Sequence, residues 1–480
     1  MDREKFQIPS LLCTADQNGA VHGIKPCENS ASSKTALCSE LDNTDKAYLP
    51  TVGRWGCEWP KTSFLGGSKS GESGKCVHHE TCYCNETFLI NHLGENGVVF
   101  NNNNTLSLLD ELLDATQVNG PWLVEHPLPL PIWATDPKQI LKFESVWHYE
   151  KFVSQLEVHI QQVLERHNYN TIGNFMALYQ SFKGSGCYNL RDYLHMYSPP
   201  ITSLHHTCVG LALELWTKLV ELNEKYPSLS NYLYLASCEE NIETVDDYVQ
   251  LGDGLEAVST SLEKEHVLLA LRFEIAGRYG VLLCDPGYHI SRAITVMQDQ
   301  LYPHTGQFVQ SREAHARKEY NYTFSANSTF VQWSETVTNA NGVKAYDTAL
   351  VYISRPYLTA VDVTERRNLV YNFRSLLSRD SKGGLKAGIY FKLKENHDEF
   401  TIFYQNGGVK KRLKYNFGSF AYPIEETTKK VVRECSLQLN LAEDALECIL
   451  ISLAQVLSDQ SYIKQLLEIN CEINNLAEDN

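Results

Sequence analysis

The spacing of apolar residues changes three times along the 480-residue chain. Residues 1–118 show little apolar periodicity and are rich in Ser, Gly, Asn and Lys, as in the tract Asn101–Asn104. Burial of so little apolar surface would not offset the conformational entropy that the chain loses on folding. We therefore expect a largely disordered extension, with local order around Trp55 to Trp59 and a short helix near Leu106 to Leu113.

Apolar residues recur at helical spacing from residue 119 to about residue 230. The expected helices are Asp136 to His167, Ile172 to Phe182, Leu190 to Met196 and Cys208 to Glu224. The last of these has the strongest pattern. It follows Pro199–Pro200, where proline interrupts helical hydrogen bonding.

From residue 231 the period approaches two, which is typical of strands with one buried face. The expected strands are Tyr232 to Ala236, His266 to Glu274, Val281 to Cys284, Thr329 to Thr338, Ala349 to Ile353, Gly388 to Leu393, Phe400 to Tyr404 and Val409 to Tyr415. Asn341–Gly342 and Asn406–Gly407 lie between such runs and predict hairpin turns.

The tail, residues 426–480, returns to a helical pattern. Asn440 and Glu443 resemble a capping box ahead of a helix that starts near Ala445. The whole pattern predicts an α+β fold. In it, a helical bundle (119–230) carries Cys208, an antiparallel β-sheet or barrel follows (231–425), and helices close the chain (426–480).

Cys208 is the first candidate for chemistry because it begins an apolar helix. The positive end of the helix dipole and the free N–H groups there favour a thiolate. The same N–H groups can bind a developing oxyanion. The alternative interpretation is a small buried cysteine that happens to begin a helix.

His266 and Asp285 are candidate partners, since a nucleophilic thiol needs a base and the base needs an orienting carboxylate. His266 begins one apolar strand and Asp285 ends the next. If Glu274–Gly277 form a four-residue loop, His266 lies opposite Asp285 on one face. A tighter turn at Gly277–Arg278 would shift the pairing by four residues. An exposed histidine and a turn aspartate are the alternative.

The order Cys, His, Asp, in which His266 is 58 positions after Cys208 and Asp285 is 19 positions after His266, resembles the transglutaminase-like branch of the papain-type fold. Within it, the chain is most similar to arylamine N-acetyltransferases over residues 135–425. That family closes its hairpin with Asp-Val-Gly-Phe-Gly, and Asp285-Pro286-Gly287-Tyr288 matches at Asp, Gly and the aromatic residue. Three features differ. His205-His206-Thr207 replaces the residues Arg-Gly-Gly-x that precede the family's Cys, and the Cys–His segment has a transglutaminase-like length. The aromatic-acidic pair that often follows the His in bacterial transglutaminase-like proteins is absent from Val267–Ala270.

The resemblance implies ping-pong transfer of an acyl group from acetyl-CoA or another acyl-CoA to an amine through a Cys208 thioester. His266 would deprotonate Cys208 and Asp285 would orient His266. Gly287 and Tyr288 are the candidate cosubstrate-binding residues. Lys410-Lys411-Arg412 is a candidate contact for CoA phosphates, with a solvated strand edge as the alternative.

Two other functions remain open. One is transglutaminase-like or peptidase activity of the same three residues on peptide substrates. The other is a catalytically silent binding scaffold, with the extension recruiting a protein partner.

The net charge and the cysteines indicate which partners and which cell compartment to expect. A net charge of −16 argues against nucleic acid or an anionic membrane as a partner. The chain shows neither a secretory signal nor an apolar run that could span a bilayer, and its fourteen cysteines form no compact framework. We therefore expect a cytoplasmic protein with reduced thiols and no permanently bound cofactor. The Cys57–Cys84 stretch, rich in Cys and His, lacks the spacing of common zinc sites, and we expect no metal.

Overall fold

The computed structural model describes residues 118–124, 126–201, 207–251, 264–313, 316–395, 398–420 and 424–475. The extension predicted for residues 1–118 therefore lies outside the described residues, apart from its last residue. So do His205, His206 and the Cys57–Cys84 stretch. Within the described part of the chain, no helix is long and apolar enough to cross a membrane.

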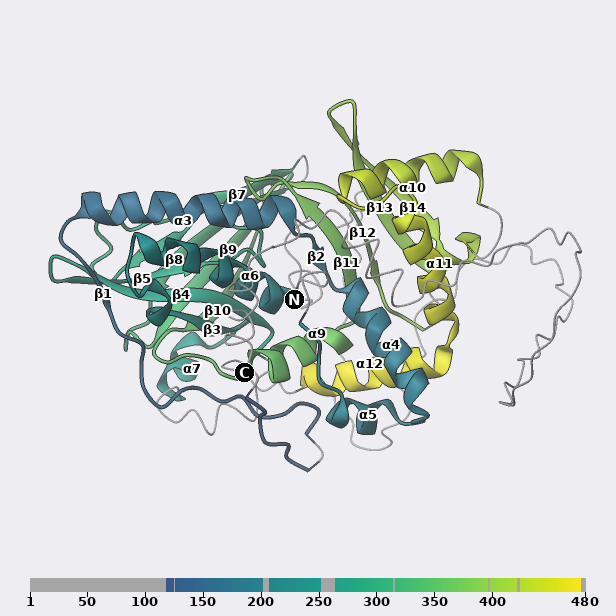
Figure 1. The fold of residues 1–480 in the computed structure, drawn as a ribbon, viewed down its shortest axis with the longest axis horizontal. Coiled ribbons are helices and arrows are strands. Elements are labelled where there is room, and N and C mark those ends of the chain that lie inside the picture. Colours follow the sequence, from purple (N-terminus) through teal and green to yellow (C-terminus); the bar gives the residue numbers. More distant parts are fainter. Residues whose placement is uncertain are drawn as a thin grey trace, which may run out of the picture. The chain divides into compact units, whose positions relative to one another are not determined.

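Among the described residues, the larger of two sheets has nine strands in the order β6-β5-β4-β3-β10-β9-β8-β7, with β1 beside β4 (Figure 1). Its strands are β1 (Leu141–Phe143), β3 (Leu233–Glu239), β4 (His266–Ile275), β5 (Arg278–Cys284), β6 (Ile294–Met297), β7 (Phe308–Glu313), β8 (Ala316–Phe324), β9 (Phe330–Asn339) and β10 (Lys344–Tyr352). The β1–β4 pair is parallel and the other pairs are antiparallel. The predicted α+β class is confirmed.

Alternation along β4 explains how this sheet is buried. Val267, Leu269 and Leu271 belong to a core shared with helices α3 (Val146–Arg166) and α6 (Cys208–Val220). Leu268 and Ala270 face the opposite way, into a core built from β-strands of the same curled sheet. Because side chains alternate between the two faces, one strand contributes to both cores.

The α3 helix begins ten residues later than the pattern predicted. Residues 141–143 pair with β4 as β1, and Ser145 caps the helix by accepting a hydrogen bond from the backbone N–H of His148 at 3.3 Å. Backbone pairing to the sheet therefore overrides the helical spacing upstream of Ser145.

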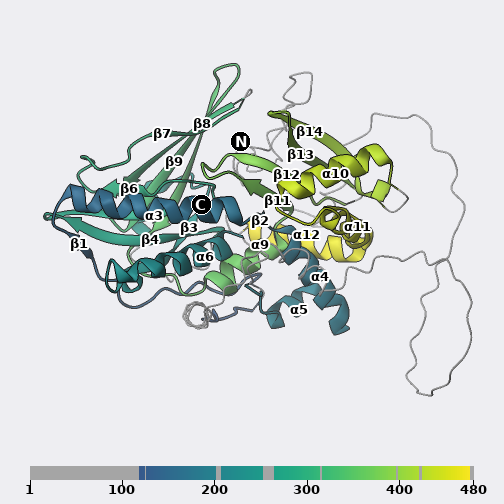
Figure 2. The same cartoon turned by 45° about the horizontal axis from the view of Figure 1, so that its top comes forward.

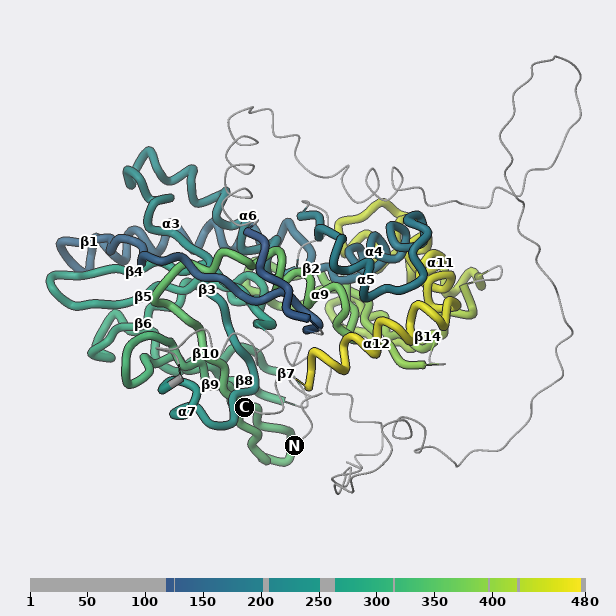
Figure 3. The backbone as a smooth tube through the Cα atoms, turned by 90° about the horizontal axis from the view of Figure 1, so that it is seen from below, coloured from purple at the N-terminus to yellow at the C-terminus, as the bar shows by residue number. Residues whose placement is uncertain are grey.

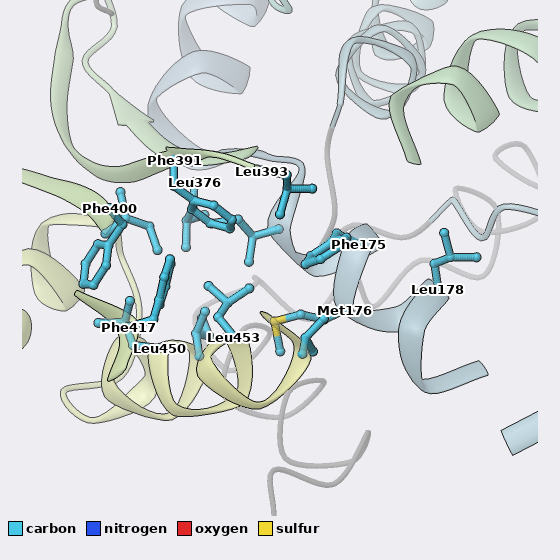
Figure 4. Packing of buried hydrophobic residues seen from close by; sticks show 14 of the residues in the cluster. Phe175, Met176, Leu178, Leu376, Phe391, Leu393, Phe400, Phe417, Leu450 and Leu453 are labelled. Atoms are coloured by element: carbon cyan, nitrogen blue, oxygen red, sulfur yellow. The ribbon is translucent and has the colours of Figure 1, made fainter. Parts of the chain in front are cut away.

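The smaller sheet has the order β14-β13-β12-β11-β2. Its strands are β2 (Tyr169–Asn170), β11 (Phe373–Arg379), β12 (Leu385–Lys392), β13 (Glu399–Asn406) and β14 (Val409–Asn416). The helices that share its core are α4 (Ile172–Ser185), α5 (Leu190–Met196), α10 (Glu426–Gln438), α11 (Ala445–Ser458) and α12 (Gln460–Asn475). Figure 4 shows strand side chains such as Leu376 and Phe391 above Leu450 and Leu453 of α11.

The helices before the large sheet divide between two cores. The α3 and α6 helices pack on the large sheet, whereas α4 and α5 pack with the small sheet and the C-terminal helices (Figure 2). The domain boundaries at residues 118, 230 and 425 stay predictions.

A buried segment joins the two sheets between β10 and β11. It consists of η5 (Ala360–Glu365), whose hydrogen bonds follow the π pattern, and α9 (Arg366–Val370). The α9 helix lies between α6 and α4 in Figures 1 and 3. This segment brings residues from far along the chain to the N-terminus of α6.

Several local predictions need correction. Strands β1, β2, β6, β7, β8 and β11 were not predicted. The Asn440 capping box is wrong: Asn440 has φ of 57° and follows the last turn of α10. The backbone N–H groups of Asn440 and Leu441 donate to Leu437 and Ser436, which is a helix C-terminal motif. The Asn341–Gly342 and Asn406–Gly407 hairpins are both present.

Candidate active site

Cys208 is the first residue of α6, and Thr207 is its N-cap. The Thr207 hydroxyl oxygen accepts a hydrogen bond from the backbone N–H of Val209 at 3.3 Å, and the hydroxyl donates to the buried Glu365. Burial raises the pKa of Glu365 to about 7, although hydrogen bonds from Thr207 and Asn174 act in the opposite direction. Glu365 therefore fixes the residue directly before the thiol.

His266 and Asp285 come together through a hairpin that lies between the two predicted forms: it is tighter than the four-residue loop and begins one residue before the predicted Gly277–Arg278 turn. The turn is the two residues Ala276–Gly277, both with positive φ, so Ile275 pairs with Arg278. The last observed pair is Leu269 with Cys284, and the same register places His266 opposite Gly287, two residues from Asp285. The predicted pairing was wrong by two residues. An even shift keeps both side chains on the same face.

The imidazole and the carboxylate form a buried hydrogen bond. His266 Nε2 lies 2.9 Å from Asp285 Oδ2, and the two residues are 2% and 3% exposed. The other carboxylate oxygen, Oδ1, accepts the backbone N–H of Tyr288 at 3.0 Å. Burial lowers the pKa of His266, but Asp285 and Cys208 raise it, and the net pKa lies well above 6.5. The site therefore favours an imidazolium.

Gly287 shows how closely the thiol and the imidazole approach each other. A Cβ atom added at Gly287 would lie 2.9 Å from Cys208 Cβ and 3.0 Å from His266 Cε1. Cε1 is bonded to both ring nitrogens, and Nε2 is bound to Asp285. Nδ1 is therefore the nitrogen available to the thiol, in keeping with the influence of Cys208 on the His266 pKa.

A cleft of about 600 Å³, partly open to solvent, lies over these residues. Gly287 and Tyr288 line it beside Cys208 and His266, as do the carboxylates of Glu240 and Glu265. The Tyr288 hydroxyl donates to Glu240. Burial raises the pKa of Glu240 to about 7, while His266 acts to lower it. The cleft thus has an acidic wall beside the imidazole.

The chain was compared with family models, with curated proteins and with solved structures. None of them matches. The resemblance to arylamine N-acetyltransferases therefore rests on the sequence residues alone and stays a prediction.

Sequence reasoning missed Asn368 of α9, which also lines the cleft. Its side-chain Nδ2 lies 3.6 Å from Cys208 Sγ, and its backbone carbonyl accepts from the fully buried Arg374 at 2.8 Å. An amide donor held beside a nucleophile can stabilise an oxyanion. The Arg-Arg-Asn sequence around it is typical of a solvated surface, so the sequence gives no signal for this role.

Arg379 of β11 was missed for the same reason. It is fully buried and donates to the backbone carbonyls of Pro286 at 2.6 Å and His167 at 2.5 Å. Burial lowers its pKa to about 9. The guanidinium therefore holds the loop that follows Asp285.

Other predicted candidates lie away from the cleft or outside the described residues. Lys410 is bound to Glu313, with 3.0 Å between Nζ and Oε1, and the cleft lining does not include it. Cys284 is buried in the core that the large sheet shares with α3 and α6. Within the described ranges, no group of three or more Cys, His, Asp or Glu side chains is placed to hold a metal ion.

Proposed function

We propose that the protein is a cysteine-dependent acyltransferase that passes an acyl group to an amine through a thioester on Cys208. The observation that carries the proposal is the environment of His266. Its Nε2 is bound by Asp285 and its Cε1 atom lies close to Gly287 beside Cys208, and a cleft opens onto both Cys208 and His266. A base oriented by a carboxylate beside a thiol is the arrangement that nucleophilic catalysis requires.

The first half-reaction loads the enzyme. His266 accepts the proton of the Cys208 thiol through Nδ1, and the thiolate attacks the acyl carbon of the donor. An S–C bond forms, and the bond from the acyl carbon to the leaving group breaks. For an acyl-CoA donor, the CoA thiolate leaves and takes its proton from His266. The Asn368 amide and the N-terminal N–H groups of α6 stabilise the negatively charged oxygen.

The second half-reaction releases the product. The amine nitrogen attacks the thioester carbon, a C–N bond forms, and the C–S bond to Cys208 breaks. His266 takes the proton that the amine loses, and the thiolate–imidazolium pair is restored. Asp285 keeps the imidazole in one tautomer and stabilises its cation during both steps.

The arrangement of secondary structure supports the proposed papain-type relationship. The nucleophile begins a buried helix, the histidine begins β4, and the aspartate directly follows the antiparallel strand β5 beside it. The predicted helical bundle is not seen as one unit, because α3 and α6 pack on the large sheet and α4 and α5 pack with the small sheet. Gly287 and Tyr288 then contact the acyl group or its carrier.

The acidic wall of the cleft favours a second candidate for the acyl donor. CoA carries phosphates, and the cleft arginine, Arg367, already donates to the side chains of Asn470 and Asn474 at 3.2 Å and 3.0 Å. Glu265 and the ionised form of Glu240 repel phosphate and attract a cationic amine. A transglutaminase-like reaction, in which a peptide carboxamide is the donor and ammonia leaves, fits this charge pattern.

The test is to trap the acyl-enzyme. The full-length protein is incubated either with acetyl-CoA or with a glutamine peptide, and the intact mass and a peptide map are recorded. We expect an acyl adduct on Cys208 that is absent from Cys208→Ala and retained in the control Cys187→Ala. The productive donor separates the two reactions. No adduct with either donor would support a silent scaffold instead.

The setting of the reaction is also a proposal. The buried Cys208, Cys238, Cys284 and Cys435 are free thiols, which supports a reducing compartment such as the cytoplasm. A protein partner recruited by residues 1–118 remains a prediction.

A further inference from the structure

A second histidine, His289, lines the same cleft as Cys208 and is used by neither half-reaction. Its φ is 61°, in the left-handed region that costs free energy for any residue except glycine. The motif that the hairpin resembles ends in glycine at this position. Glycine would adopt this conformation at a lower free-energy cost, yet this chain has a histidine at the position.

Contacts from strand β7 of the large sheet, from the loop after β5 and from the turn after β11 hold His289 in this conformation. Its backbone carbonyl accepts from Gln310 Nε2 at 3.2 Å, and its backbone N–H donates to Pro286 at 3.3 Å. The turn after β11 packs so tightly that a Cβ atom at Gly383 would lie 1.9 Å from the His289 carbonyl oxygen. The backbone of His289 is thus fixed from both sides.

Arg379 determines which ring nitrogen of His289 carries the proton. Arg379 Nη1 lies 3.0 Å from His289 Nδ1, and a guanidinium can only donate. Nδ1 must therefore accept, and the proton of the neutral ring lies on Nε2. Burial lowers the pKa of His289 well below 6.5, and Arg379 and Lys318 lower it further. The ring is accordingly a neutral donor.

The Nε2–H donor has no partner among the described residues. His289 is 4% exposed, and its Nε2 is buried without a hydrogen-bond partner. A buried N–H donor without an acceptor lowers the stability of the fold. A ligand that accepts a hydrogen bond from His289 Nε2–H would remove this cost. A neutral imidazole whose second nitrogen faces a cation is suited to polarising a carbonyl group.

We infer that His289 is a substrate-binding residue that donates from Nε2 to a carbonyl oxygen of the acyl substrate. This role rests on the proposed acylation of Cys208. It gives the cleft two different walls: Glu240 and Glu265 face the amine acceptor, and His289 faces the acyl group. The substrates that fit best are acyl donors with an uncharged carbonyl or carboxamide oxygen.

The test compares two probe esters with a thiol reagent that contains no acyl group. The esters are p-nitrophenyl acetate and the p-nitrophenyl ester of N-acetylglycine, which has a second carbonyl. The thiol reagent is methyl methanethiosulfonate, and modification of Cys208 is followed by mass spectrometry. In His289→Gly and His289→Asn we expect acylation by at least one ester to slow about 10-fold, because one hydrogen bond to the substrate is lost. Reaction with the thiosulfonate should change less than about 3-fold, as no carbonyl is bound.

The matched control is Gln300→Gly, which removes the side chain from an exposed residue with φ of 56° outside the cleft. It should leave both reactions unchanged. Equal acylation rates in wild type and both His289 variants would overturn the inference, and so would an equal slowing of the thiosulfonate reaction. If neither ester acylates the wild-type protein, the proposed function fails first.

Discussion

Gly287→Ala is the substitution that the geometry of the site constrains most tightly. Gly287 does not have a left-handed φ, so alanine meets no backbone penalty there. The new Cβ atom would instead lie 2.9 Å from Cys208 Cβ, 3.0 Å from His266 Cε1 and 3.2 Å from Cys208 Cα. It would therefore press on both Cys208 and His266.

The size of the effect follows from these contacts. Carbon atoms in contact normally lie about 3.5–4.0 Å apart, so Cys208 and His266 must each move away from residue 287 by roughly 0.5–1 Å. A displacement of about 1 Å between reacting groups can lower a rate about 10²-fold. Overpacking of this kind also lowers the free energy of unfolding by about 1–3 kcal/mol. The acylation rate should therefore fall by more than the fraction of protein that becomes unfolded.

The assay is the rate at which p-nitrophenyl acetate acylates Cys208, measured beside urea unfolding of the same protein. Gly184→Ala is the matched control: Gly184 lies in α4 and a Cβ atom there meets nothing within 4 Å. The control should keep the wild-type rate and at least the wild-type stability. If Gly287→Ala acylates at the wild-type rate, Cys208 and His266 do not act across Gly287 and the reasoning is refuted.

Three further predictions concern the supporting residues. Asn368→Ala should lower acylation by p-nitrophenyl acetate about 10²-fold and leave the thiosulfonate reaction unchanged; an unchanged acylation rate would exclude Asn368 as an oxyanion donor. Arg379→Met should lower the free energy of unfolding in urea by about 3 kcal/mol because buried acceptors lose their donor, and a loss below about 0.5 kcal/mol would contradict this. The pKa of Glu365 is about 7 in the folded protein, against its usual 4.5, so wild-type stability should fall as pH rises from about 4.5 to 7. This fall should be absent in Glu365→Gln. The free energy of unfolding of the variant relative to wild type, measured by urea titration, should therefore grow by about 2 kcal/mol between pH 5 and 8. Parallel pH profiles of the two proteins would refute the raised pKa of Glu365.

The spacing of apolar residues predicted those helices and strands in which the buried side chains follow a single helical or strand period. Leu190–Met196 and the start of α6 at Cys208 agree with the pattern, as does the start of β4 at His266. The shared face of His266 and Asp285 was predictable even from a wrong register, because side-chain direction depends only on whether the shift is even.

Residues that act through distant contacts could not be predicted. Arg374 and Arg379 give β11 the composition of an exposed segment, yet both are fully buried because backbone carbonyls accept their hydrogen bonds. Asn368 reaches Cys208 across 160 residues of sequence. Such contacts form only when segments far apart in the sequence pack together, so the local spacing of apolar residues does not predict them.

The most direct test of the central claim is the rate of Cys208 alkylation by iodoacetamide near neutral pH, measured by peptide mapping with Cys187 as the internal reference. Cys208 is 3% exposed, whereas Cys187 is more accessible and lies outside the cleft. We predict that Cys208 reacts at least about 10-fold faster than Cys187, and that His266→Ala removes this advantage, because the imidazolium stabilises the thiolate. Slower alkylation of Cys208 than of Cys187, in proportion to exposure, would contradict the account.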